Sequence, residues 1–163
     1  MLQKGDKAPD FELSDDGGSK VRLSELLAGG PIVLYFYPAD FTPVCTREAC
    51  LFRDHHAELA ARGVRVYGVN SASAETHARF REKHGLPFPL LVDPDKKVIK
   101  AYGASGPLGL GVRRISYLIG PDGLIKEAVK ADLRLGPHAE FIRRVLEAHG
   151  LRDAPAAGEG KDA

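Results

Sequence analysis

The chain has 163 residues, of which 44% are hydrophobic and 28% charged, an ordinary composition for a globular protein with one main domain. Its 23 Lys and Arg residues nearly balance its 22 Asp and Glu residues, and the net charge of +1 excludes a strongly basic surface for nucleic acid or an acidic membrane. The longest apolar run, residues 31–38, is too short to cross a bilayer, so we expect neither nucleic acid nor a membrane as a partner.

The first third of the chain alternates between strand and helix patterns. Residues 21–27 predict a short strand followed by a short helix that Ser24 caps. Residues 32–37 are β-branched, aromatic and continuously apolar, which indicates a strand buried on both faces. Residues 45–62 place apolar side chains near helical spacing, and Gly63 marks the end of this helix.

The same alternation continues through the middle of the chain. Residues 64–69 indicate a second buried strand. Ser73 then predicts the N-cap of a helix that runs to His84. Residues 90–92 predict a short strand, and residues 97–102 predict one or two helical turns.

The last part of the chain adds a hairpin and a helix. Residues 115–119 and 124–129 flank Gly-Pro-Asp-Gly, which is typical of a hairpin, and residues 137–149 have one apolar helical face. Residues 153–163 are expected to be a flexible tail behind a domain of residues 1–152, because Ala, Gly, Pro and charged residues dominate them. Strand and helix alternation followed by a hairpin predicts an α/β sandwich with a mixed sheet.

Cys45 and Cys50 are the only cysteines of the chain. The first residues have no apolar stretch behind their charges, so we expect no signal peptide and a cytoplasmic location. In a cytoplasmic protein, two cysteines indicate reactive thiols or a metal site rather than a framework of structural disulfides.

Cys45 follows the first buried strand, at the edge of the sheet where α/β proteins form their sites. Pro38 and Pro43 stiffen the turn, and Cys45 falls at or just before the first helical turn. Unpaired backbone N–H groups and the positive end of the helix dipole favour a thiolate there. The alternative is a small buried hydrophobe, as most free cysteines are. The position, the prolines and the second cysteine together favour a reactive thiol.

These residues carry a resemblance to a known family. Pro38-x-x-x-Thr42-x-x-Cys45 resembles the active-site signature of the peroxiredoxins. Cys50, five residues further on, is similar to the second cysteine of the Q-type subgroup, also called the bacterioferritin comigratory proteins. The resemblance covers nearly the whole chain and includes residues 5–11, 86–93, 102–103 and 114–119.

The resemblance implies a thioredoxin-like sandwich, with a central mixed β-sheet flanked by helices, that reduces hydrogen peroxide and organic hydroperoxides. It further implies that Cys45 becomes a sulfenic acid and then forms a disulfide with Cys50, which thioredoxin or a similar dithiol reductant reduces. No metal or organic cofactor is expected, and the protein is expected to be a monomer. The chain departs from the family pattern at Val44, Ala72 and Gly120, none of which is a signature residue.

Peroxide reduction requires a nucleophile, hydrogen-bond donors for the peroxide oxygens, and little competing water. With Cys45 as the nucleophile, Thr42 can place a hydroxyl on the peroxide, and Pro38 would shield the site from water. The resemblance assigns Arg114 as the source of positive charge and donors. Glu48, one helical turn after the cysteine, is expected to hold this arginine in place.

Each of these assignments has an alternative. Thr42 alone could be a turn residue, and Glu48 could be a first-turn charge of small effect. Arg113 and Arg114 are adjacent in a predicted strand, so their side chains point to opposite faces and only one can serve the site. The resemblance, and not the pattern, favours the second of the two.

Other side chains invite other chemistry. His55 and His56, with both cysteines, suggest zinc, but no second close pair completes four ligands. The glycines of residues 103–111 loosely resemble a phosphate-binding loop, but the Lys-Ser/Thr pair is missing. Three further histidines are expected on solvated helix faces or ends: His77, His84 and His138.

Two other functions use the same thiols. A dithiol-disulfide exchanger would carry Cys-x-x-Cys, whereas four residues separate the two cysteines here. A non-catalytic redox sensor would also need a reactive thiol, but it reacts once where a peroxidase turns over.

Overall fold

The computed structural model describes residues 1–149, which fold into a seven-stranded sheet with five α-helices and a short 3-10 turn. The strands are β1 (Glu12–Asp15), β2 (Lys20–Arg22), β3 (Ile32–Phe36), β4 (Arg65–Asn70), β5 (Leu90–Val92), β6 (Ile115–Ile119) and β7 (Ile125–Lys130). The helices are α1 (Leu23–Leu27), α2 (Pro43–Ala61), α3 (Ala74–His84), α4 (Lys97–Ala101) and α5 (Gly136–His149), and the 3-10 turn is Pro107–Gly109.

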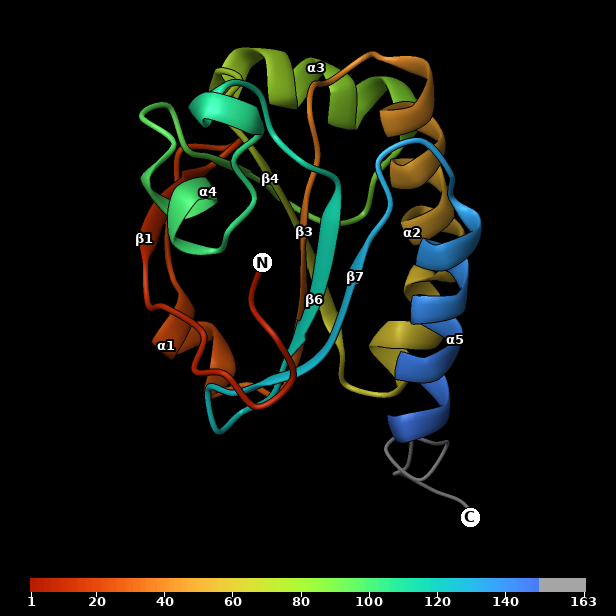
Figure 1. The fold of residues 1–163 in the computed structure, drawn as a ribbon. Helices are drawn as coiled ribbons and strands as arrows, with labels where there is room; N and C mark the ends of the chain where they lie inside the picture. The colour runs from red at the N-terminus through yellow and green to blue at the C-terminus, as the bar shows by residue number, and fades with distance from the viewer. Residues whose placement is uncertain (150–163) are drawn as a thin grey trace.

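The sheet is mixed, with the strand order β2-β1-β5-β4-β3-β6-β7. Strands β3, β4 and β5 pair in parallel, whereas β1, β2, β6 and β7 join the sheet through antiparallel pairs. Figure 1 shows α2 and α5 side by side against one face, while α1 and α4 lie on the opposite side. The predicted α/β sandwich with a mixed sheet is therefore confirmed.

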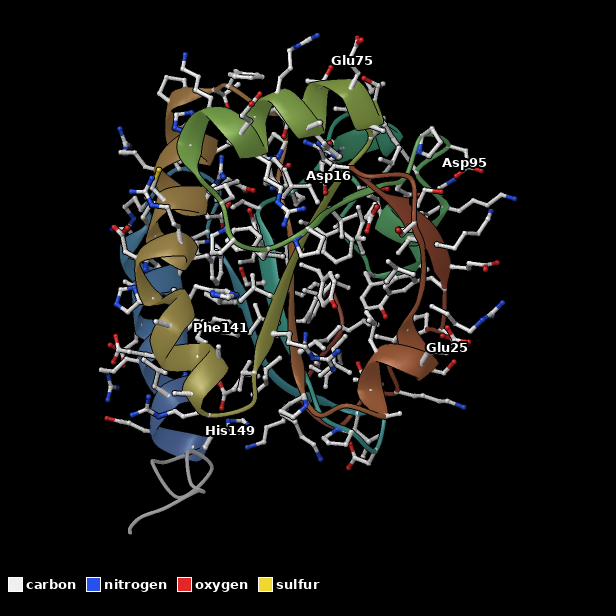
Figure 2. All side chains as sticks on the ribbon, turned by 180° about the vertical axis from the view of Figure 1, so that it is seen from behind. Asp16, Glu25, Glu75, Asp95, Phe141 and His149 are labelled. Carbon is white, nitrogen blue, oxygen red and sulfur yellow. The ribbon has the colours of Figure 1, made fainter. Side chains whose placement is uncertain are left out.

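Strand β3 lies at the centre because both of its faces are apolar. Val33 and Tyr35 pack into a core with residues of α2, α3 and α5, and the alternate residues, such as Leu34, pack with α1 and α4. In Figure 2, Phe141 of α5 lies on the inner side of its helix, whereas exposed carboxylates such as Glu75 point outward. The site therefore begins at the end of a strand that the two cores hold rigidly.

Most predicted elements are present within a residue or two of their expected bounds, including the helix capped by Ser73, whose hydroxyl accepts from the N–H of Thr76. The cap assigned to Ser24 is wrong. Its own backbone N–H donates to the carboxylate of Asp10, 3.0 Å away, so a distant residue satisfies the start of α1. Strand β1 was not predicted, because its short segment is only partly buried and has no strong apolar alternation.

The predicted tail, residues 153–163, lies outside the described residues. Within residues 1–149, no helix is both long enough and apolar enough to cross a membrane.

Candidate active site

Cys45 lies in the first turn of α2, where the sequence predicts it. Strand β3 ends at Phe36, a loop of residues 37–42 follows, and α2 begins at Pro43. The helix starts two residues before the predicted bound because proline suits the first helical position, where no N–H partner is needed. The cysteine side chain is buried, with 1% of the residue exposed.

Arg114 reaches Cys45 because of the antiparallel pairing between β3 and β6. Phe36, at the end of β3, pairs with Ile115, at the start of β6, so the residue before β6 lies beside the beginning of α2. Its Nη2 donates to the cysteine Sγ at 3.1 Å, and its Nη1 donates to Oε1 of Glu48 at 2.7 Å. One buried guanidinium therefore contacts both the thiol and a carboxylate.

Asp132, which follows β7, distinguishes the two candidate arginines. Its Oδ1 accepts from the backbone N–H of Arg114 at 3.0 Å, and its backbone carbonyl accepts from Nε of the same residue at 3.0 Å. Its Oδ2 accepts from Nη1 of Arg113 at 3.0 Å. Both arginines lie just before β6 rather than within a strand, and Arg114 is the one whose guanidinium faces the thiol.

The charges of the site depend on burial. Burial alone would lower the pKa of Arg114, but the negative charges of Glu48 and Cys45 raise it above its ordinary value, so the guanidinium stays charged. Burial raises the pKa of the Glu48 carboxyl to about 7, against the opposing effect of Arg114. Near neutral pH the carboxyl is therefore only partly ionised.

His138 of α5 completes the buried polar cluster. Burial lowers the pKa of its imidazole, which favours the neutral form. Its Nε2 lies 3.1 Å from the carbonyl oxygen of Ala131, so that nitrogen carries the proton and Nδ1 is an acceptor. Nδ1 lies 3.1 Å from Oγ of Ser116 and 3.4 Å from Oε2 of Glu48. A protonated Glu48 can donate to this nitrogen, which agrees with the raised pKa of the carboxyl.

A cavity of about 420 Å³ lies at the start of α2, lined in part by Pro38, Thr42, Val44 and Arg114, although Cys45 itself is not among its lining residues. The Thr42 hydroxyl donates to the carbonyl oxygen of Ala39 at 3.1 Å, so its oxygen remains free to accept a further hydrogen bond. Pro38 is exposed at the rim of this cavity, whereas the cysteine beneath is buried. A larger cavity, about 610 Å³, is lined by residues of β1, β5 and α4 and contains none of these side chains.

Cys50 lies half-buried in the third turn of α2, and both cysteines are free thiols. Five residues of regular helix place the two Cα atoms roughly 8.6 Å apart and turn their side chains by about 140°. A disulfide requires Cα atoms within about 6.8 Å. The intact helix therefore keeps Cys45 and Cys50 from bonding.

The structure also corrects the expected placement of two histidines. His77 and His138 were expected on solvated helix faces, but both are completely buried and hydrogen-bonded. In residues 1–149, no three His, Cys, Asp or Glu side chains are grouped so that they could hold a metal ion. Asp132 and Ser116 were not among the predicted site residues, because nothing in the local sequence marks them.

A helix-start thiol held beside a buried guanidinium, at the end of a central strand of an α/β sandwich, defines a thiol-dependent redox protein. Comparison with known proteins identifies the family within this class. Residues 4–128 match the model of the AhpC/TSA family. Peroxiredoxin Bcp of Bacillus subtilis is 44% identical over 140 residues, which are 82% of this chain and 88% of that protein.

Solved structures support the same family assignment. The chain superposes on peroxidoxin BcpB from Mycobacterium tuberculosis with a TM-score of 0.84 and 36% identity, over 91% of this chain and 98% of that one. The bacterioferritin comigratory protein of Xanthomonas campestris gives a TM-score of 0.77 and 32% identity, over 85% of this chain and 91% of that one. The chain therefore belongs to the AhpC/TSA family and, within it, is a Q-type peroxiredoxin with a thioredoxin-like fold.

Proposed function

We propose that this peroxiredoxin reduces hydrogen peroxide and organic hydroperoxides with Cys45 as the attacking thiolate and Cys50 as the resolving thiol. Family membership makes the chain a thiol peroxidase, and the residue roles are our assignment. The observation that carries the assignment is the 3.1 Å contact between Nη2 of Arg114 and the cysteine Sγ. A fixed positive charge at this distance stabilises a thiolate in a buried site.

The first step transfers one oxygen atom. The Cys45 thiolate attacks the terminal oxygen of the hydroperoxide, and the O–O bond breaks with both electrons going to the leaving oxygen. That oxygen takes a proton and departs as water or an alcohol, which leaves a sulfenic acid on the sulfur. The sulfur is oxidised and the peroxide is reduced by the same two electrons.

Thr42 and Arg114 act on opposite parts of this transition state. The threonine oxygen, whose own proton is directed to Ala39, accepts a hydrogen bond from the peroxide O–H and orients it. The guanidinium donates to the leaving oxygen as negative charge develops there. Pro38, at the rim, limits the water that could compete for these groups.

The second step joins the two cysteines. The Cys50 thiol attacks the sulfenic acid, an S–S bond forms, and water leaves. Because an intact α2 holds the two Cα atoms too far apart, the first turns of the helix must unwind before this step. Opening a helix end is among the less costly motions of a folded domain.

The third step restores both thiols. A dithiol reductant such as thioredoxin attacks the disulfide, passes two electrons and two protons to the protein, and leaves as its own disulfide. We expect the chain to act as a monomer, because both cysteines lie on one helix and the cycle needs no second chain. The cytoplasmic location expected from the sequence is part of the same proposal.

Organic hydroperoxides are included because the mouth of the cavity is apolar. Leu110 and Leu133 line it and are 71% and 80% exposed. They offer an apolar contact for the carbon chain of a substrate. The bacterioferritin comigratory protein of Xanthomonas campestris has alkyl peroxide reduction activity, and this activity of a relative supports the same assignment here.

The test is a coupled assay that contains the protein, a hydroperoxide, thioredoxin, its reductase and NADPH. Continuous NADPH consumption that depends on both the protein and the hydroperoxide is the expected result. Oxidation that stops after one equivalent, with thioredoxin and with other dithiols, would instead identify a sensor that does not turn over.

A further inference from the structure

A second buried polar cluster joins the loop of residues 37–42, which carries Pro38 and Thr42, to the interior of the protein. Its centre is Asp40, whose side chain is completely buried. Oδ1 accepts from the hydroxyl of Tyr37 at 2.5 Å, and Oδ2 lies 2.7 Å from Nδ1 of His77 on α3. Nε2 of the same histidine lies 3.0 Å from the carbonyl oxygen of Leu91 in β5. The cluster therefore ties the active-site loop to a helix and a strand on the far side of β4.

The geometry requires a proton between Asp40 and His77. The carbonyl oxygen of Leu91 can only accept, so Nε2 must carry a hydrogen. Without a further proton, a lone pair on Nδ1 would face a carboxylate oxygen at 2.7 Å. A shared proton turns that contact into a strong, short hydrogen bond that is shielded from water.

The residue next to Asp40 shows why the loop needs such a contact. Phe41 has a φ of 67°, a left-handed conformation that a bulky side chain adopts only when its surroundings hold it. Its ring packs edge-on against Phe80 of α3 at 5.1 Å between centroids, and Nζ of Lys83 lies 5.8 Å from the ring centre. Helix α3 therefore holds two consecutive loop residues.

We propose that Asp40 and His77 are positioning residues that hold residues 37–42 and the first turn of α2 in the form that reacts with peroxide. When this contact is lost, Phe41 relaxes and Thr42, the residue before α2, moves with it. The unwound form, in which Cys50 can reach Cys45, then becomes more populated. The inference rests on the proposed peroxidase cycle and goes beyond it, since neither residue touches the reacting atoms.

The proposal predicts opposite effects on the two chemical steps. Attack on the peroxide needs the folded loop, so losing the contact slows it. Disulfide formation needs the unwound helix, so the same loss accelerates it. A residue with a merely structural role would slow both steps or neither.

The main experiment measures the two steps separately in Asp40→Ala. The first step is followed in a Cys50→Ser background, by quenching and trapping the sulfenic acid for mass spectrometry. The second is followed as disulfide formation in the chain that retains both thiols. We expect the first rate to fall by about tenfold or more. We expect the second rate to rise, and the fraction overoxidised to sulfinic acid at high peroxide to fall.

Asp40→Asn is the conservative variant that tests hydrogen bonding directly. The asparagine oxygen can accept from Tyr37, and its amide can donate to Nδ1 of a neutral His77, so all contacts of the cluster are retained. It should restore most of the first-step rate that Asp40→Ala loses. If both variants are equally impaired in that step, the positioning role is wrong.

Tyrosine variants provide a milder test if Asp40→Ala does not fold. Tyr37→Phe removes one donor to Asp40 and should shift both steps in the same directions as Asp40→Ala, with smaller changes. Tyr35→Phe is the matched control, because its buried hydroxyl has no hydrogen-bond partner in the described residues. Equal rates in Tyr37→Phe and Tyr35→Phe would contradict the proposal.

Amide exchange separates this inference from the proposed function, because it needs no peroxide. In reduced protein, residues 41–46 should exchange faster in Asp40→Ala than in Asp40→Asn or the unmodified chain. Unchanged exchange overturns the inference even if the chain is an active peroxidase. An unmodified chain that fails to react with any hydroperoxide overturns the proposed function instead.

Discussion

Nη2 of Arg114 lies 3.1 Å from Sγ of Cys45, although the two residues are 69 positions apart in the chain. The antiparallel pairing of β6 with β3 brings the two together, and Asp132 fixes the arginine through its backbone N–H and its Nε. Because the pairing and the hydrogen bonds form on folding, the positive charge is in place before peroxide arrives. Such preorganisation is the main way in which proteins stabilise charge that develops during a reaction.

The first prediction concerns the two arginines. Arg114→Ala should lower the rate constant for peroxide attack by about 10²–10³-fold, because the thiolate and the leaving oxygen both lose a donor. Arg113→Ala is the matched control, since its guanidinium contacts Asp132 and not the sulfur. A larger defect in the control would mean that the other arginine serves the reaction.

The second prediction separates the roles of the cysteines. Cys45→Ser should abolish peroxide consumption, because no other thiolate lies beside Arg114. Cys50→Ser should keep the first turnover and accumulate the sulfenic acid, which excess peroxide then oxidises further. Rapid-quench mass spectrometry measures both outcomes. Loss of the first turnover in both variants to the same extent would refute the assignment of roles.

The third prediction concerns the stability conferred by Glu48. Burial raises the pKa of its carboxyl from 4.5 to about 7, so the folded state holds this proton more tightly than the unfolded state. The resulting stabilisation is complete below about pH 4.5 and is lost as pH rises through about 7. Between about pH 5 and pH 8, the free energy of unfolding should fall by about 1–3 kcal/mol more in the chain with Glu48 than in Glu48→Gln.

Urea unfolding of reduced protein measures this difference, with Cys45→Ser as the common background so that the reactive thiol is absent from every variant compared. Glu58→Gln is the matched control, because that glutamate lies exposed on the same helix. If Glu48→Gln and Glu58→Gln give parallel pH profiles, the buried carboxyl does not hold its proton as described.

The fourth prediction concerns helix α2. Residues 46–52 should exchange their amide hydrogens faster in the disulfide form than in the reduced form, because the bond cannot form within a regular helix. Hydrogen exchange read by mass spectrometry, on samples with the bond proven by peptide mapping, gives the comparison. A Cys45–Cys50 bond within an undisturbed helix would exclude the unwinding step.

The sequence predicts the parts of this site that are local. Pro38, Thr42 and Cys45 lie within one short segment after a strand whose continuous apolar pattern marks it as central. A helix start also has a local signal, in this case Pro43 at its first position. The buried strand, the helix start and the reactive cysteine all lie in one stretch of sequence, so the loop and the nucleophile could be predicted from the sequence alone.

The rest of the site depends on contacts between distant residues. Arg114 was assigned by resemblance, because only the β3–β6 register brings it to the thiol. Glu48 was expected to hold this arginine because it lies one helical turn after Cys45 on the same helix. His77 and His138 lie on helices with many charged residues, and a histidine there has the same appearance in sequence whether buried or exposed. Asp40, the partner of His77, is 37 positions away in the chain, and Ser116, the partner of His138, is 22 positions away. No local sequence pattern encodes such pairs.

The central claim is that one hydroperoxide molecule converts the two thiols into a Cys45–Cys50 bond. The most direct test is intact-mass analysis with peptide mapping after reduced protein has received one equivalent of hydroperoxide. The account predicts the loss of two hydrogen atoms from each chain and a single cross-linked peptide that contains both cysteines. An unchanged mass, or oxidation confined to residues other than Cys45, would contradict it.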